Sequence, residues 1–213
     1  MPSLASTPVA VPDPAVARIL RQAREHLFTH GYSQCTMDEL AADLGMSKKT
    51  LYVHFASKDE IFRVVLDQLG AEIRAEADAL LANRQLGFAE KLRGFAEGMF
   101  ERLSKLNPRT MRELQRFAPH LHQQLVELRS RNIPYVFGRF IEEGQLAGKV
   151  RTDINPAFAV DFFLQAMQGL LQSGALDRHK IAPRDLVPRA IDLFFGGLLT
   201  PAGRKEHEKL FAH

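Results

Sequence analysis

Cysteine, tryptophan and long apolar runs are scarce or missing in this chain of 213 residues, which has one cysteine, Cys35, and no tryptophan. A lone cysteine cannot form a disulfide within the chain, as is typical of a reducing cytoplasm, and we expect Cys35 to be a small buried or half-buried structural residue. No apolar run reaches the roughly 18 residues that a membrane-spanning helix needs. The sequence also does not open with a basic segment followed by an apolar one. We therefore expect a cytoplasmic protein without a membrane partner.

The motifs of common enzyme classes are missing as well. The chain has no Gly-x-Gly-x-x-Gly, no phosphate-binding loop and no Gly-x-Ser-x-Gly. His26 and His30 have the i, i+4 spacing of a helical metal-binding pair, but no third ligand follows them. His120 and His122 are two residues apart, which places them on different faces of a helix. We expect no enzyme activity, no metal site and no cofactor.

Charge of one sign is not in large excess either. The formal net charge is +3, and residues 1–70 hold seven Lys/Arg against eight Asp/Glu, a net charge of −1. The overall charge therefore does not indicate nucleic-acid binding, and such a site must depend on where single charges lie. Between Ser47 and Ser57 the chain has Lys48 and Lys49 but no acidic residue. This short segment could present a basic surface on a nearly neutral protein.

The two-residue alternation of β-strands and hairpin dipeptides such as Asn-Gly are missing, whereas apolar residues recur with a helical period after Pro14. We predict an all-α protein with about nine helices, and Pro134 predicts a kink or break in one of them. The predicted helices lie at 14–30, 36–44, 47–55, from 57 to beyond 80, 88–106, 108–118, 120–147, 156–175 and 183–199. The predicted organisation is a flexible arm at 1–13, a DNA-binding domain at 14–60, a ligand-binding and dimerisation domain at 61–203 and a charged tail at 204–213.

Two short predicted helices form a helix-turn-helix. Thr36 and Glu39 have the spacing of a capping box at the first helix, Gly45 suits the turn, and Ser47 can cap the second helix. A second capping box, at residues 57–60, begins the long helix that we expect to join the two domains. The residues left facing outward on the second short helix are Lys48, Lys49, Thr50, Tyr52 and His54.

The stretch from Ala23 to Leu66 resembles the N-terminal domain of the TetR family of transcriptional regulators. The resemblance is carried by the helix-turn-helix and by the string Leu-Tyr-x-His-Phe-x-Ser-Lys-Asp-Glu at residues 51–60. The rest of the chain resembles the family only in layout. The resemblance implies a homodimer that binds a palindromic operator in double-stranded DNA and responds to a small-molecule inducer.

The resemblance also implies roles for single residues at the DNA. Thr36, Tyr52 and Lys58 correspond to phosphate contacts, and the residues that open the second short helix usually meet base edges or nearby phosphates. For His54, a phosphate contact and a structural hydrogen bond both remain open. The full set expected at the DNA is Thr36, Ser47, Lys48, Lys49, Thr50, Tyr52, His54 and Lys58.

Two further sets of residues follow from the C-terminal part of the chain. The resemblance places a ligand pocket among the helices from residue 88 to 147, although each candidate could instead fill the core. The pocket candidates are Met99, Phe100, Leu103, Met111, Leu114, Phe117, Phe137, Phe140 and Met167. The last two predicted helices are apolar on more than one face, which favours burial against a second subunit. The dimer candidates are Phe158, Phe162, Phe163, Leu170, Leu186, Ile191, Phe194, Phe195 and Leu198.

The function that we expect is transcriptional repression: a dimer binds its operator and is released by a small apolar or amphipathic ligand, with coupling through the long helix that begins at residue 57. The alternative is a transcriptional activator, or a regulator controlled by a protein partner instead of a small molecule.

Overall fold

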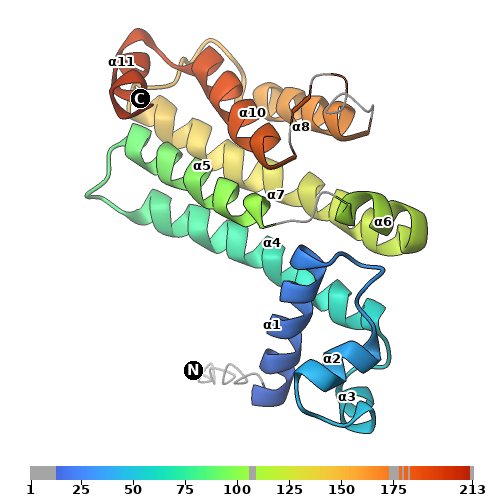
Figure 1. Ribbon diagram of the computed structural model, residues 1–213. Helices are drawn as coiled ribbons and strands as arrows, with labels where there is room; N and C mark the ends of the chain where they lie inside the picture. The colour runs from blue at the N-terminus through green and yellow to red at the C-terminus, as the bar shows by residue number, and fades with distance from the viewer. Residues whose placement is uncertain (1–12, 106–108, 173–177, 179, 182, 212–213) are drawn as a thin grey trace, which may run out of the picture.

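The structure, a computed structural model, describes residues 13–105, 109–172, 178, 180–181 and 183–211. Within these ranges it contains ten α-helices and no strand, which confirms the all-α prediction (Figure 1). The helices are α1 (Pro14–Thr29), α2 (Met37–Asp43), α3 (Lys48–His54), α4 (Lys58–Ala82), α5 (Phe88–Ser104), α6 (Thr110–Phe117), α7 (Pro119–Leu146), α8 (Pro156–Gln172), α10 (Pro183–Leu198) and α11 (Pro201–Phe211). None of the described helices is both long and apolar enough to cross a membrane. Of the expected N-terminal arm only Asp13, which caps α1, lies within the described residues.

Side-chain caps fix the starts of the helices around the predicted helix-turn-helix. The Thr36 hydroxyl accepts from the backbone N–H of Glu39 at 3.1 Å, and the Glu39 carboxylate accepts from the backbone N–H of Thr36 at 2.9 Å, so the first capping box is complete. At α4 the Ser57 hydroxyl caps the backbone of Glu60 at 3.2 Å. The Glu60 carboxylate, however, accepts from the N–H of Ala56, one residue before the position that a capping box requires.

The first hydrophobic core joins the helix-turn-helix to α6 and to the first half of α7. Leu27, Leu51 and Phe62 from the N-terminal helices are buried in it together with Leu114 and Leu121. Residues far apart in the sequence therefore share one core. The N-terminal helices do not pack as a separate unit from the rest of the protein.

The long helix α4 contributes to both cores of the protein. Ile61 and Val65 lie in the first core, and Ala77 and Leu81 lie in the second. The predicted boundary between residues 60 and 61 falls within the first turn of this helix. Because α4 is continuous, its two ends must move together or the helix must bend.

The second core lies among α5, the second half of α7, α8 and α10, and phenylalanine rings fill its centre. The ring of Phe137 stacks on Phe163 with 4.4 Å between centroids and on Phe195 with 5.6 Å. Phe95 packs against Phe137 edge to face at 6.2 Å. Offset and edge-to-face ring pairs stabilise a core beyond the burial of their area.

Helix α7 continues through Pro134, so of the expected kink or break, the break does not occur. On one side of the proline, the buried side-chain amide of Asn132 donates to the Gly70 carbonyl of α4 at 2.9 Å. On the other side, Val136 is buried in the second core. This packing holds both halves of α7 in place, and it outweighs the loss of one backbone hydrogen bond at the proline.

Residues 204–211 of the predicted charged tail belong to the helix α11, which reaches Phe211. The Thr200 hydroxyl accepts from the backbone N–H of Gly203 at 3.1 Å and caps this helix. Lys149 and Glu206 form an ion pair, and His207 is buried. The charged composition concealed an amphipathic helix whose inner face packs on α5.

Candidate nucleic-acid interface

The turn between α2 and α3 sets the direction of α3, which we call the reader helix. Gly45 adopts φ +61°, a left-handed conformation that favours glycine. Leu51 anchors the reader helix in the first core. The guanidinium of Arg18 on α1 donates to the Leu44 carbonyl at 2.5 Å and holds the turn against α1. The reader helix is therefore fixed on one side and open on the other.

The reader helix lies at the end of the molecule farthest from α8 and α11 (Figure 1). Its cap is the Ser47 hydroxyl, which accepts from the N–H of Thr50 at 3.0 Å. Lys49, Thr50 and Tyr52 are exposed, as predicted. Lys49 has no ion pair or side-chain hydrogen bond within the part of the chain that the structure describes, so its ammonium is available to a partner.

Val53 is an exposed residue of the reader helix that the sequence analysis missed. Its side chain is 76% exposed, although valine is usually buried. It lies four residues after Lys49, which places both on one face of the helix. This spacing was visible in the sequence, but the residues named as facing outward on this helix did not include Val53. An exposed aliphatic group here can contact a thymine methyl group.

Lys48 is exposed on the reader helix but is paired with an acid from α2. Its Nζ lies 2.7 Å from Oδ1 of Asp38, and this hydrogen bond raises the pKa of Lys48. The sequence analysis searched for acids only between residues 47 and 57, so it did not find the acid that folding brings to this surface. The exposed surface of the reader helix therefore has a negative charge beside it, and Lys48 would have to leave or share the Asp38 carboxylate to contact a DNA phosphate or base.

Two predicted phosphate contacts, Thr36 and Lys58, have their polar groups engaged within the protein. The Thr36 hydroxyl caps α2, as described above. The Lys58 ammonium donates to the carbonyl oxygens of Tyr32 and Cys35, both at 3.2 Å, and lies 3.9 Å from the centre of the Tyr32 ring. Lys58 thus anchors the loop between α1 and α2 to the start of α4. Thr36 remains at the surface and Lys58 is half-buried.

Cys35 and Tyr32 are buried beside this lysine. Burial raises the pKa of the Cys35 thiol to about 12, so the thiol stays protonated at neutral pH. Cys35 is buried, as predicted. The Tyr32 hydroxyl donates to Asp59 at 2.6 Å, and burial with this hydrogen bond raises the pKa of Tyr32 above its usual range.

The histidines near the reader helix have partners within the protein. Nδ1 of His54 lies 3.7 Å from Oδ2 of Asp13, the residue that caps α1, which favours the structural role for His54. Nε2 of His26 lies 2.5 Å from Oδ2 of Asp43, and the rings of His26 and His30 pack edge to face. Among the described residues, no three His, Cys, Asp or Glu side chains are grouped as a metal site requires.

The predicted pocket residues are spread over separate parts of the structure. Leu114 is in the first core with Met111 at its edge, whereas Phe100 and Phe117 are exposed. The side chain of Leu103 lies outside the described residues. The candidates that the structure does bring together, in or against the second core, are Met99, Phe137, Phe140 and Met167. A cleft lies elsewhere, between α1, α4 and α5, and none of the nine candidates lines it.

The predicted dimer residues divide into buried and exposed groups. Phe158 and Phe162 on α8 are 68% and 63% exposed, and Leu193 on α10, which was not predicted, is 80% exposed. Leu170 and Phe194 are half-buried. The candidates that fill the core of their own subunit, and so are corrected here, are Phe163, Leu186, Ile191, Phe195 and Leu198. The prediction combined both faces of each helix, and only the outer faces are free for a second subunit.

Helix α6 and the start of α7 contact the elements that flank the helix-turn-helix: α1, the loop after it and the start of α4. The Glu113 carboxylate accepts from the backbone N–H of Ser33 at 3.0 Å, and the Thr110 hydroxyl donates to a carbonyl of α1 at 3.2 Å. Nε2 of His120 lies 2.9 Å from Oδ2 of Asp59 at the start of α4. The sequence predicted coupling through α4 alone, and the structure adds a second connection through α6 and α7.

Known proteins resemble this chain in its helix-turn-helix and in its fold. Residues 19–65 match the family described as bacterial regulatory proteins, tetR family. The uncharacterised HTH-type transcriptional regulator YvaF of Bacillus subtilis is 24% identical over 85% of this chain and 94% of its own length. The HTH-type transcriptional repressor DhaR of Mycobacterium sp. is 21% identical over 78% of this chain and 85% of its own. The structure of the fatty acid degradation regulator FadR from Bacillus halodurans covers 88% of this chain and 98% of its own, at 19% identity and a TM-score of 0.64.

Proposed function

Because this chain belongs to the TetR family of transcriptional regulators, we propose that it is a repressor that binds a palindromic operator as a homodimer and leaves it when a small molecule binds. The observation that carries this proposal is the exposed surface of the reader helix, with Lys49, Tyr52 and Val53 on a capped and firmly packed helix. An α-helix fits the major groove of B-form DNA. The ammonium of Lys49 can donate to guanine O6 and N7, and the Tyr52 hydroxyl can reach a phosphate.

A single helix-turn-helix buries too little surface to bind one operator tightly, so the proposal needs two copies. The outer faces of α8 and α10 support a contact between them. Phe158, Phe162 and Leu193 are exposed there. A Cβ added at Gly169 of α8 or Gly197 of α10 would meet no atom within 4 Å, so another helix can approach closely at both positions. Two readers related by a twofold axis and spaced by about one helical turn (~34–36 Å) would read a palindrome.

Release from the operator requires a ligand that binds more tightly to a state of the dimer in which the two reader helices are not spaced to fit the two half-sites. A preference of about 2.7 kcal/mol for that state weakens operator binding about a hundredfold. The shared first core, the continuous helix α4 and the Glu113–Ser33 and His120–Asp59 contacts support such coupling, because they connect the reader side to the body of the protein. The name of the relative DhaR supports repression as the direction of control.

The experiment that tests the proposal starts from random double-stranded DNA. Selection with the purified full-length protein should recover a palindrome, and a reporter placed behind that palindrome should be expressed more strongly when the gene is deleted. Recovery of no preferred duplex would contradict DNA recognition. Lower reporter expression on deletion would instead identify an activator. If no compound in a screen changes either the thermal midpoint or the operator affinity, control by a small molecule is wrong.

A further inference from the structure

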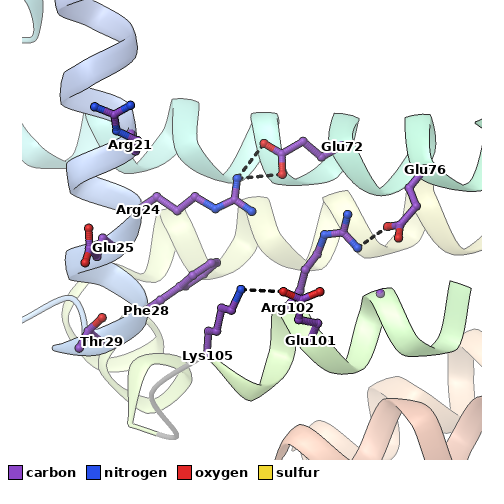
Figure 2. Close-up of a pocket in the computed structure, with 11 residues that line it drawn as sticks. Arg21, Arg24, Glu25, Phe28, Thr29, Glu72, Glu76, Glu101, Arg102 and Lys105 are labelled. Carbon is purple, nitrogen blue, oxygen red and sulfur yellow. Dashed lines mark hydrogen bonds and ion pairs between the residues drawn. The ribbon is translucent and has the colours of Figure 1, made fainter. Parts of the chain in front are cut away.

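The charged cleft between α1, α4 and α5, of about 610 Å³, is lined by four acids and four bases (Figure 2). Arg24 on α1 donates to both carboxylate oxygens of Glu72 on α4, at 2.7 and 2.8 Å. Arg102 on α5 pairs with Glu76, the next acid along α4. The lining of this cleft therefore favours neither an anion nor a cation. A charge that the protein leaves uncompensated lies instead on α7.

This charge is Arg129. One of its guanidinium nitrogens donates to the Met111 sulfur of α6 at 3.3 Å, and a thioether sulfur is a weak acceptor. Among the described residues, no carboxylate or carbonyl oxygen accepts from this guanidinium. The neighbouring acids of α7 and α6 are engaged elsewhere, since Glu127 accepts from the side chain of Gln123 and Glu113 accepts from the loop after α1. Arg129 thus has no counter-ion in the part of the chain that the structure describes.

The Arg129 side chain is surrounded by protein and can still be reached from outside. Burial lowers its pKa, because the charged form loses contact with water there. The residue nevertheless keeps part of its accessible surface, and its nitrogens without an acceptor are not sealed from solvent. A polar group that is both surrounded and reachable lines a depression, as in small-molecule sites. A charge taken from water without a counter-ion costs free energy, and a bound anion would recover part of that cost.

Three half-buried residues of α7 share one face of the helix with Arg129, namely His122, Val126 and Ile133, and we call these four residues the α7 stripe. Burial and, next, the charge of Arg129 lower the pKa of His122, so the imidazole lies near the guanidinium and is neutral at pH 7. Met111 packs at the edge of the first core and Ile133 at the edge of the second. The stripe therefore offers a free cation and a neutral ring among aliphatic side chains and a thioether.

We infer that the α7 stripe binds a small organic anion, with the carboxylate on Arg129 beside His122 and the apolar body on Met111 and the aliphatic residues of the stripe. A guanidinium can hold a carboxylate through two parallel N–H groups, and a methionine adapts its shape to an apolar ligand. The effect on DNA rests on the proposed function. Met111 lies on α6 between Thr110 and Glu113, which bind α1 and the loop after it. An anion that draws Arg129 away from Met111 shifts α6 and lowers operator affinity.

Three probes of equal chain length and different charge test the site. Hexanoate, 1-hexanol and hexylamine share the same alkyl chain, and their binding to the full-length protein can be measured by titration calorimetry without DNA. Hexanoate should bind, and the neutral and cationic probes should bind at least about tenfold more weakly, because they cannot form charge-assisted hydrogen bonds with a guanidinium. Hexanoate that does not bind, or three probes that bind alike, would overturn the anion site.

Matched variants of α7 separate the site from general charge effects. Arg129→Met removes the cation and keeps an apolar side chain in its place, whereas Arg131→Met removes an exposed arginine of the same helix. The first variant should weaken hexanoate binding at least about tenfold, and the second should leave it unchanged. Equal hexanoate affinity in the two variants would contradict the assignment.

The neutral probe shows whether Arg129→Met keeps the shape of the site. Its affinity should not fall in this variant, because the aliphatic lining is retained. A loss of 1-hexanol binding as large as the loss of hexanoate binding would show that Arg129 supports the shape of the site and does not hold the anion.

The consequence for DNA is tested with the selected operator. Hexanoate should lower the operator affinity of the wild-type protein, and the same concentration should have less effect on Arg129→Met. Hexanoate that binds without changing operator affinity would overturn the shift of α6 and leave the repressor proposal intact. Failure to bind any operator would contradict the proposed function, while the calorimetric result for the α7 stripe would still hold.

Discussion

The Lys48 ammonium on the reader helix lies 2.7 Å from the Asp38 carboxylate on α2. The two side chains are 51% and 70% exposed, so their attraction is weakened by water and salt and adds little to the stability of the fold. A carboxylate at this position also repels DNA phosphates and competes with them for Lys48. We therefore expect this pair to set the strength of DNA binding more than the stability of the protein.

Replacing Asp38 by Asn should strengthen DNA binding about two- to fivefold at low salt, because it frees Lys48 and removes a negative charge beside the phosphates. The control is Asp67→Asn, which removes the same charge from α4, where Asp67 pairs with Arg63. Fluorescence anisotropy with a labelled operator, at two salt concentrations, measures the operator affinity of both variants. If operator affinity rises equally in the two variants, the effect comes from net charge and the role given to the Lys48–Asp38 pair is wrong.

Lys49→Ala should weaken operator binding more than Lys48→Ala. Lys49 has no partner among the described residues, whereas Lys48 must first leave Asp38. We expect a loss of about tenfold for Lys49→Ala and a loss several times smaller for Lys48→Ala. Titrations against the operator and a scrambled duplex show whether Lys49 reads a base or only a phosphate. A larger loss for Lys48→Ala would contradict the geometry.

Val53 should read a thymine methyl group in the major groove. Replacement of thymine by uracil removes only that methyl group, so one substituted half-site position should weaken binding of the wild-type protein by a few-fold. The same DNA change should have little effect on Val53→Ala. A scan of uracil through the operator tests this. If no position distinguishes the wild-type protein from the variant, Val53 does not read thymine.

The helix-turn-helix could be predicted from the sequence because the residues that form it act locally. The capping residues Thr36 and Ser47, the turn glycine Gly45 and the anchor Leu51 act within a few residues of their own positions. The Lys48–Asp38 pair could not be found in this way, because it depends on the angle between α2 and α3. The shared core was missed for a similar reason: a helical period shows that Leu121 is buried, but not which helix covers it.

The predictions for the C-terminal helices were less accurate because apolar residues are expected both in the core and on a binding surface. The sequence does not tell these two locations apart. Phe162 and Phe163 are adjacent in the sequence, yet the first is exposed and the second is buried. Only the packing of α8 on α7 and α10 separates them. The charged cleft had no signal in the sequence at all, since Arg24, Glu72 and Arg102 come from three helices.

Arg129 on α7 is a charge without a carboxylate partner among the described residues. Its guanidinium contacts the Met111 sulfur at 3.3 Å, and burial lowers its pKa from 12.5 to about 10. A lowered pKa in the folded state means that the charged form is disfavoured there, and this penalty is fully present at every pH below about 10. Arg129→Met should therefore raise the thermal midpoint at pH 7 by about 2–4 °C for each kcal/mol recovered.

The matched control for this variant is Arg131→Met, which removes an exposed arginine two residues further along the same helix. It should leave the thermal midpoint nearly unchanged. Circular dichroism melts of the two variants against the wild-type protein make the comparison. A lower midpoint for Arg129→Met would show that this arginine stabilises the fold.

The double variant Phe158→Asp, Phe162→Asp should separate the subunits, because it places four carboxylates in an apolar contact between two copies. Both side chains are exposed within one subunit, so the variant should fold normally. The control is Phe117→Asp, which changes an exposed phenylalanine on α6 away from the α8 and α10 surface. We expect operator affinity to fall at least about a hundredfold in the double variant and little in the control.

The number of chains on one operator, measured by sedimentation equilibrium, tests the central claim most directly. The account predicts two chains on a palindromic duplex, and loss of tight binding when about half a helical turn of DNA is inserted between the half-sites. One chain per duplex, or binding that is insensitive to the inserted DNA, would contradict a dimer that reads a palindrome with its two reader helices.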